Sequence, residues 1–471
     1  MNIQGVILWS DVFIWLLVLA GMAAGCWSRR QPPLVAAFKR VGQSRPGMAA
    51  ATFLSVFLLV GLLDSVHYRE ALPGKEGEPK VYSIEVLSVL DGLLSPLRSR
   101  MEKTYSEPLA TRAYAKEMIE ERQADGSLRS LRDYPRLRHG GAHLGSDEGR
   151  AGEDIAGRGL RAALLAAFLW MLLAVAVTGR VAGTASVSRK EAWCQIYRGE
   201  TTFAWNAVLA AVAVLLLGSS LLFLLAGEYH VFGTDKVGQD VLYQVLKSIR
   251  TALVIGLVTT LVTLPLAIVL GIIAGYFRGW IDDLIQYLYT TLNSIPGVLL
   301  IAAAVLMMQV IIDTHPQWFA TAAERADMRL LALCFILGLT SWTGLARLLR
   351  GEVLKLRELD YIQAAQAFGV SDARIIARHL LPNLMHIVII ALVMDFSGLV
   401  LAEAVLSYVG IGVDPSMISF GTMINNARME LGREPVVWWS LIAAFAFMFV
   451  LVLAANLLAD AVRDAFDPRM G

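Results

Sequence analysis

Apolar and polar stretches alternate along this 471-residue chain, and nine apolar stretches are candidates for crossing a bilayer. A membrane-spanning helix needs about 20 mostly apolar residues. The pattern therefore predicts an all-α polytopic membrane protein of about nine transmembrane helices. The expected spans are Val6–Cys26, Met48–Leu63, Leu160–Val177, Ala204–Leu225, Thr251–Tyr276, Leu284–Ile312, Leu330–Leu349, His386–Tyr408 and Val437–Ala459.

The longest polar stretch, residues 66–159, is the one sizeable soluble region that the pattern predicts. Ile84–Met101 and Pro108–Gln123 have compositions compatible with helices, whereas Asp133–Gly159 is rich in Gly, Arg and Asp and is expected to be irregular. The region could be a small domain or a set of helices that lie against the membrane.

The amino-acid composition agrees with a polytopic membrane protein and argues against a nucleic-acid partner. Hydrophobic residues make up 56% of the chain, and the mean hydropathy is +0.58, beyond the range of soluble domains. The formal net charge of +1 at pH 7 predicts no basic surface for nucleic acid. The three cysteines lie far apart, without metal-binding spacing, and are expected to be inert packing residues.

Basic residues in the short loops orient the spans. The loop after the first span carries five bases between Arg29 and Arg45 and no acid, which places it in the cytoplasm. Alternation then puts the N-terminus and residues 66–159 outside and the C-terminus inside. The short basic loops all fall on the cytoplasmic side.

The segment Asp360–Pro382 is a polar, helix-compatible insert between two spans. Ala364 and Ala365 favour a helix, Gly369 allows a turn, and Ser371-Asp372 can start a second short helix. Pro382 marks the return to the membrane. The segment predicts a compact helical knob of the kind that fits the groove of another protein.

This segment resembles the EAA loop of bacterial ABC-transporter permeases. Gln363 stands where the family has Glu, and Ala364, Ala365, Gly369 and Leu381-Pro382 fall in register. Further stretches are similar to motifs of the dipeptide/oligopeptide/nickel branch, second-permease type. They are Gly233–Asp240 (GTDKVGQD), Glu403–Gly412 (EAVLSYVGIG) and Asp460–Arg469 (DAVRDAFDPR).

The resemblance covers about residues 200–471 and implies a domain organisation. Residues 204–471 would form a six-span permease core with its coupling loop at 360–382. Residues 1–65 would supply extra N-terminal spans, and residues 66–159 would form a periplasmic insert. Residues 160–203 would supply another extra span and a cytoplasmic linker. The implied location is the bacterial inner membrane, with the N-terminus in the periplasm and the C-terminus in the cytoplasm.

The implied function is half of the translocation pathway of an ATP-driven importer, with peptides the favoured cargo. The implied partners are a homologous second permease, two cytoplasmic ATPases, a periplasmic or lipid-anchored binding protein and membrane lipid. The coupling helix would sit in a cleft of an ATPase, and ATP and Mg would bind there rather than to this chain. The residues that carry this expectation are Gln363, Ala364, Ala365, Gly369, Asp372, Leu381 and Pro382.

Two acids and one outer motif admit more than one interpretation. Asp395 and Glu403 lie in the span after the loop, where an ionisable group indicates a pathway or a polar partner on another helix. The outer motif suits a tight turn and a helix start. It could serve architecture alone or dock a binding protein. Its residues are Gly233, Thr234, Asp235, Gly238 and Asp240.

Catalytic patterns are absent from the sequence, which argues against an enzyme. It contains no G-x-x-x-x-G-K-[ST], H-E-x-x-H or G-x-S-x-G, and the pair His139/His143 lacks an acidic or Cys partner at metal-binding spacing. Two alternatives remain: a membrane sensor or binding scaffold acting through residues 66–159, and an intramembrane enzyme using Asp395 or Glu403.

One internal similarity adds to the picture. The stretch from His143 to Ile155 resembles that from His230 to Val241, and both precede an apolar span. This could be chance in a Gly/Asp-rich loop. It could also mean that a permease-like N-terminus is split by an insertion that carries extra spans.

Overall fold

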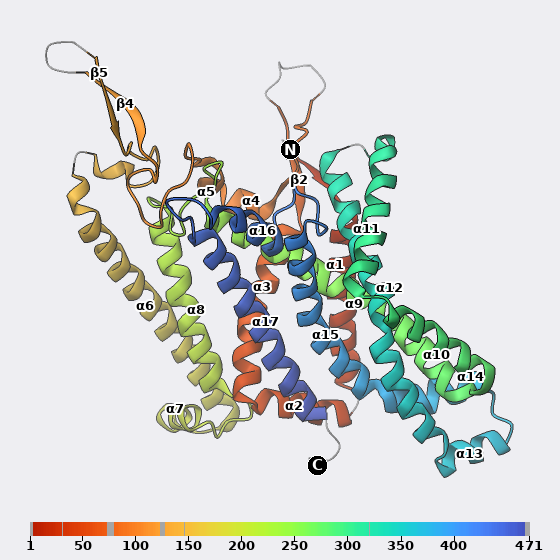
Figure 1. Cartoon of the computed structure of the whole chain (residues 1–471). Helices are drawn as coiled ribbons and strands as arrows, with labels where there is room; N and C mark the ends of the chain where they lie inside the picture. Colours follow the sequence, from red (N-terminus) through yellow and green to blue (C-terminus); the bar gives the residue numbers. More distant parts are fainter. Residues whose placement is uncertain are drawn as a thin grey trace.

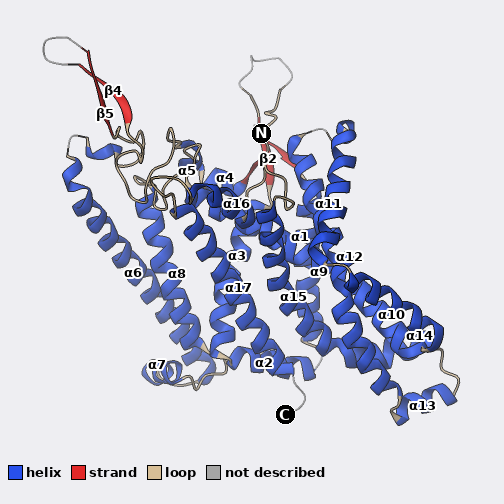
Figure 2. Cartoon of the chain, viewed as in Figure 1, coloured by secondary structure: helices blue, strands red, loops and turns tan. Residues whose placement is uncertain are grey.

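The computed structural model describes residues 3–30, 32–72, 80–122, 128–145, 147–319 and 321–466. Long, roughly parallel helices dominate it (Figures 1 and 2). In the described residues, eight helices have the length and apolar composition to cross a membrane, which confirms the all-α polytopic class. They are α3 (Arg45–Asp64), α6 (Ala151–Ala185), α8 (Trp205–Ala226), α9 (Val241–Phe277), α11 (Gly297–Thr314), α12 (Ala322–Arg357), the continuous segment Asp372–Val409 and α17 (Trp439–Phe466).

The first expected span is helix α1 (Trp9–Ser28), in which the apolar part is the shorter stretch Trp9–Ala23. The short helices α2 (Pro32–Gln43) and α7 (Arg189–Arg198) link spans at one end of the bundle (Figure 1). The coupling-loop helix α13 (Asp360–Ala367) and the C-terminal end of α17 lie at this same end, which we call the coupling end.

The opposite end carries the insert and two small sheets (Figure 2). Strand β2 (His67–Glu70) pairs antiparallel with both β1 (Ile3–Val6) and β3 (Leu87–Ser88). Strands β4 (Glu117–Arg122) and β5 (Leu128–Asp133) form a projecting hairpin. The short helices here are α4 (Val89–Leu93), α5 (Ser95–Ser99) and α16 (Phe420–Glu430).

Three expected helical segments differ from the structure. The expected helix Ile84–Met101 contains strand β3 and then the two short helices α4 and α5. The second half of the expected helix Pro108–Gln123 is strand β4, which extended pairing with β5 stabilises. The expected single span Leu284–Ile312 is two helices, α10 (Gly279–Ser294) and α11. Pro296 lacks an N–H and disfavours helical geometry at the residue before it, and Ile295 is extended (φ −92°, ψ 132°).

The centre of the molecule is the packing of α9 on α12, which small residues bring close together. A Cβ on Gly271 would lie 2.8 Å from the carbonyl oxygen of Ala346, and one on Gly275 would lie 2.7 Å from Cβ of Val353. Small residues four apart allow membrane helices to approach closely. Helix α9 also contacts α3, α10 and the helix α15 (Leu381–Val409) that follows the coupling loop.

Helix α3 has an unexpected place in this arrangement. It packs against α17, α8 and α9, whereas α8 packs mainly on α6 and α3 (Figure 1). The expected core began at residue 204, with α8 as its first span. In the structure, α3 packs along α9 and α17, whereas α8 pairs with α6 and reaches α9 only at its end, through Leu222 and Ala226.

Buried ion pairs attach the N-terminal elements to α9. The guanidinium of Arg250 donates to Asp11 Oδ1 (2.6 Å) and to Ser10 Oγ (2.7 Å). The ammonium of Lys247 lies 2.6 Å from Asp64 and 3.0 Å from Asp91. Removing one partner of a buried pair typically costs about 3–5 kcal/mol, so these contacts hold α1, α3 and α4 in place.

Candidate functional site

The coupling loop has the predicted helix–turn–helix form. Helix α13 ends at Ala367, and Gly369 (φ +73°) then adopts the left-handed conformation that favours glycine. Its N–H donates to the carbonyl of Gln366 (2.9 Å). Helix α14 (Asp372–Ile375) follows, with Ser371 at its N-cap but without a hydrogen bond from the Ser371 side chain. A short π-helical turn, Ile376–Leu380, joins it to α15.

Apolar side chains fix the loop to the ends of the spans. Ile362, Ile375 and Leu380 are fully buried and belong to a cluster that includes Leu349 and Val353 of α12. Both short helices therefore pack against the ends of α12 and α15.

Tyr276, near the end of α9, completes the attachment. Its hydroxyl donates to Asp372 Oδ1 (2.6 Å) and accepts from Gln366 Nε2 (3.2 Å). The side chain of Arg357 donates to the Tyr276 carbonyl and covers its ring. Helix α9 therefore holds Asp372 through Tyr276. These two residues are 96 positions apart, and the sequence pattern did not predict their contact.

The exposed surface of α13 combines small side chains with two aromatic residues, Tyr361 in its first turn and Phe368 directly after its end. Gln363, Ala364 and Gly369 are exposed, and Phe368 is 87% exposed. Our sequence interpretation missed Phe368, although an aromatic residue directly before the turn glycine of a polar loop is a usable signal. Ala365 and Leu381 are half-buried and Pro382 is exposed.

The motif Gly233–Asp240 forms a closed turn that starts α9. Asp235 Oδ1 accepts from the N–H groups of Val237 (3.0 Å) and Gln239 (2.9 Å). Asp240 caps the helix by accepting from the N–H of Leu242 (2.8 Å). These contacts confirm the expected tight turn and helix start.

The same motif clamps the insert. Thr234 Oγ1 donates to the carbonyl of Thr104 (2.9 Å) and accepts from the N–H of Ser106 (2.8 Å). The N–H of Glu102 donates to the carbonyl of Gly238 (2.9 Å). A Cβ on Gly238 would overlap the backbone of Glu102, and its φ of +77° also favours glycine. We call this set of contacts the insert clamp.

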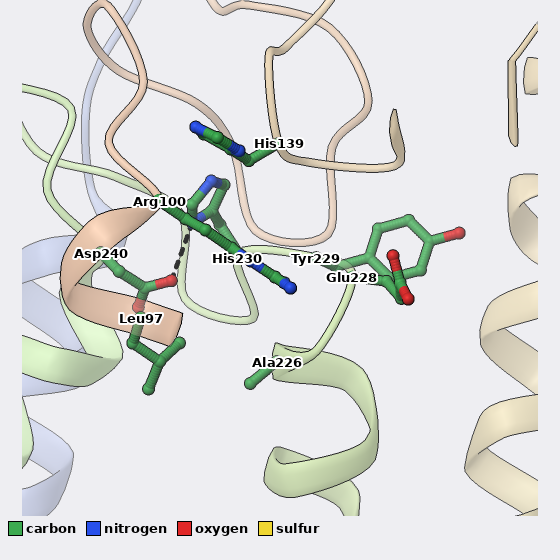
Figure 3. A pocket seen from close by; sticks show the side chains of 8 residues that line it. All are labelled: Leu97, Arg100, His139, Ala226, Glu228, Tyr229, His230 and Asp240. Carbon is green, nitrogen blue, oxygen red and sulfur yellow. Dashed lines mark hydrogen bonds and ion pairs between the residues drawn. The ribbon is translucent and has the colours of Figure 1, made fainter. Parts of the chain in front are cut away.

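A buried ion cluster lies at the centre of the insert clamp. His230 Nδ1 is 2.8 Å from Asp240 Oδ2, and its Nε2 is 3.4 Å from Glu102 Oε1. Figure 3 shows the His230 ring between Asp240 and His139. The small hollow beside this cluster leaves essentially no room for a ligand.

The charges of this cluster shift two pKa values in opposite directions. Burial disfavours charged His230, but its bonds to Asp240 and Glu102 outweigh burial and raise its pKa to about 9. Burial likewise opposes ionisation of Glu102. Hydrogen bonds from His230 and from three backbone N–H groups prevail and lower its pKa to about 2. Those groups belong to Arg138, His139 and Gly140.

The two pathway candidates have different environments. Glu403 is 1% exposed and accepts from the hydroxyls of Ser407 (2.6 Å) and Ser419 (2.9 Å). Because Ser419 caps α16, Glu403 anchors that helix in this structure and faces no open surface. Asp395 is half-buried in the middle of α15, and it forms no hydrogen bond or ion pair with the described part of the chain.

The internal similarity has a structural counterpart. His143 Nε2 lies 2.8 Å from Asp154 at the start of α6, as His230 lies 2.8 Å from Asp240 at the start of α9. Tyr229 also donates to Asp154 (3.0 Å). Ser146 of this stretch and Asp467–Arg469 of the C-terminal motif lie outside the described residues. No group of three or more His, Cys, Asp or Glu suited to a metal ion occurs among the residues that are described.

The bundle of membrane-length helices defines a polytopic membrane protein, and comparisons with known proteins place it among transport components. The family model for the binding-protein-dependent transport system inner membrane component matches residues 267–471. The oligopeptide transport system permease protein OppC of Mycobacterium tuberculosis (strain ATCC 25618 / H37Rv) is 31% identical over 242 residues, 51% of this chain and 77% of that protein. OppC of Salmonella typhimurium is 34% identical over 240 residues, which cover 51% of this chain and 72% of that protein.

A third relative is the glutathione transport system permease protein GsiD of Pectobacterium atrosepticum. It is 32% identical over 241 residues, 51% of this chain and 73% of that protein. The chain therefore belongs to the family of binding-protein-dependent inner-membrane transport components. It is a multi-pass permease subunit of the oligopeptide/dipeptide branch, as its motifs predicted.

Proposed function

We propose that this chain forms half of the translocation pathway of an ATP-driven peptide importer. A homologous second permease supplies the other half. Two cytoplasmic ATPases bind the ATP and Mg, and a periplasmic or lipid-anchored binding protein delivers the peptide. The peptide cargo is proposed because relatives are named for oligopeptide and glutathione transport. In this scheme the coupling end faces the cytoplasm and the insert faces the periplasm.

The observation that carries the proposal is the construction of the coupling loop. It presents a small exposed face that ends in Phe368, the form of an aromatic anchor for a groove on a partner. The same loop is fixed through Ile362, Ile375 and Tyr276 to three spans. A movement of the ATPase groove would therefore be transmitted to α9, α12 and α15 as to rigid levers.

The outer motif has an architectural role in this proposal, since its polar groups are engaged in the turn and the insert clamp. Asp395 is the stronger of the two pathway candidates because its carboxylate has no partner within the described chain. We assign Glu403 to anchoring α16.

Replacing Phe368 tests the coupling assignment. The tagged chain is purified in mild detergent with its co-purifying subunits identified by mass spectrometry, and peptide uptake is measured in cells. Phe368→Asp should release the ATPases and lower uptake at least tenfold, because loss of a buried aromatic anchor costs about 2 kcal/mol or more. Folding should be unaffected, since the side chain is 87% exposed.

The matched control is Met429→Asp, at a side chain that is 73% exposed on α16 at the opposite end. It should keep both the ATPases and uptake. If Phe368→Asp behaves like this control at equal protein level, the loop is not the ATPase contact. Failure of the wild-type chain to recover a second permease would contradict the importer as a whole.

A further inference from the structure

Two short helices at the coupling end form a strongly basic surface that lies outside the coupling loop. It comprises residues 29–45, with α2, and residues 180–200, with α7. We call it the basic platform. It contains nine bases and two acids. The bases are Arg29, Arg30, Lys39, Arg40, Arg45, Arg180, Arg189, Lys190 and Arg198.

The two halves of the basic platform are joined into one surface. The N–H of Ala204 donates to the carbonyl of Gly42 (2.8 Å), and Arg45 Nη2 donates to the carbonyl of Arg198 (3.2 Å). Ala192 and Ile196 are buried on the inner face of α7, which packs against α6 and α8. The platform is thus held beside the ends of α3, α6 and α8.

Exposed aromatic residues lie among the bases. Tyr197 is 80% exposed, Trp193 is 40% exposed and Phe38 is 48% exposed. On α7 they follow the exposed bases Arg189 and Lys190. Helices that lie in a membrane interface combine bases with aromatic side chains that enter the boundary between headgroups and acyl chains.

We propose that the basic platform binds the headgroups of anionic phospholipids. Each base near a negatively charged membrane surface contributes about 1 kcal/mol of attraction. The position favours lipid over the ATPase as the occupant, because α2 and α7 lie at the ends of spans and apart from α13 (Figure 1). This binding is a property of the N-terminal elements and does not depend on import or on the cargo.

The test titrates phosphatidylglycerol into the purified full chain in detergent and counts bound lipid by native mass spectrometry. Phosphatidylcholine with the same acyl chains is the neutral comparison, and inorganic phosphate tests whether the headgroup alone suffices. The wild-type chain should prefer phosphatidylglycerol at least tenfold, with no measurable response to phosphate. The double variants Lys39→Gln/Arg40→Gln and Arg189→Gln/Lys190→Gln should each lower that affinity roughly tenfold to thirtyfold.

The charge-matched control is Arg132→Gln/Lys236→Gln, two exposed bases at the other end of the molecule, which should bind phosphatidylglycerol as the wild type does. The swaps Lys39→Arg/Arg40→Lys and Arg189→Lys/Lys190→Arg should restore binding, which separates loss of charge from misfolding. Equal affinities for the two lipids, or platform variants that match the control, would overturn the proposal. Loss of a co-purified subunit with unchanged lipid binding would assign the platform to a protein partner instead.

Discussion

At the scale of single residues, Tyr276 joins the membrane helices to the coupling loop. Its hydroxyl contacts Asp372 and Gln366 from the end of α9, while Asp372 itself is largely exposed. The loop motif places Ala365, Gly369 and Pro382 by local preference, but the residue that orients them comes from a distant helix. Sequence patterns therefore identified the loop and not its attachment.

Replacing Tyr276 by Phe should loosen the loop without unfolding the protein. It removes two hydrogen bonds, each worth about 0.5–1.5 kcal/mol, and keeps the ring. We expect faster hydrogen exchange over residues 360–375 and several-fold lower uptake. Tyr287→Phe is the control, at an exposed ring on α10, and should change neither quantity. Unchanged exchange in the Tyr276 variant would remove this residue from the coupling path.

At the scale of elements, the insert is held by the turn that starts α9. The contacts of Thr234 and Gly238 with residues 102–106 are all at the backbone or through short side chains. The sequence predicted the turn from its Gly, Thr and Asp content. It could not predict the clamp, because Glu102 and His230 are 128 positions apart.

The strength of the insert clamp should depend on pH. The folded pKa of His230 is raised from 6.5 to about 9, so its contribution is complete below about pH 6.5 and is lost as pH rises through about 9. The pKa of Glu102 is lowered from 4.5 to about 2, so its contribution is complete above about pH 4.5 and is lost as pH falls through about 2. The His230 contribution is on the order of 3 kcal/mol, since each unit of pKa change corresponds to about 1.4 kcal/mol.

Hydrogen-exchange protection factors over residues 101–106 measure this dependence, because they are corrected for intrinsic exchange. Protection should be highest between about pH 4.5 and 6.5 and should fall towards pH 9. His230→Gln should flatten the alkaline fall. His143→Gln, outside the clamp, should retain it. A profile that is identical in the wild type and the His230 variant would show that the ion cluster does not hold the insert.

At the scale of the whole molecule, one N-terminal helix lies against spans of the expected permease core. Helix α3 touches α9 and α17, whereas α8 lies on its outer side with α6. The N–H of Gly141 donates to the carbonyl of Glu228 (2.8 Å), so the chain returns to the same point after passing through α6, α7 and α8. We infer that these three helices are an insertion into the loop between α3 and α9.

Deleting residues 142–227 and joining Gly141 to Glu228 through a short Gly-Ser linker tests this inference. Because α3 keeps its contacts with α9 and α17, the shortened chain should fold, recover its partners and retain uptake. Gly61→Leu tests the contact between α3 and α9 directly, because Gly61 lies against Leu253 of α9. Overpacking at such a contact costs about 1–3 kcal/mol of stability. It should lower thermal stability. A deletion variant that unfolds, or that loses its partners, would place α8 in the core.

The sequence by itself determined the all-α polytopic class, the approximate positions of most spans, the coupling loop and the family. These depend on hydropathy and on Gly, Ala and Pro preferences, which act over a few neighbouring residues. Only the tertiary structure decided that α3 packs along α9 and α17, that Pro296 divides one expected span, and that Glu403 anchors α16. The attachments through Tyr276 and through Glu102 with His230 also emerged only there. Each of these, except the break at Pro296, depends on contacts between helices or loops that are far apart in the sequence. Local sequence preferences do not specify which distant residue a side chain contacts.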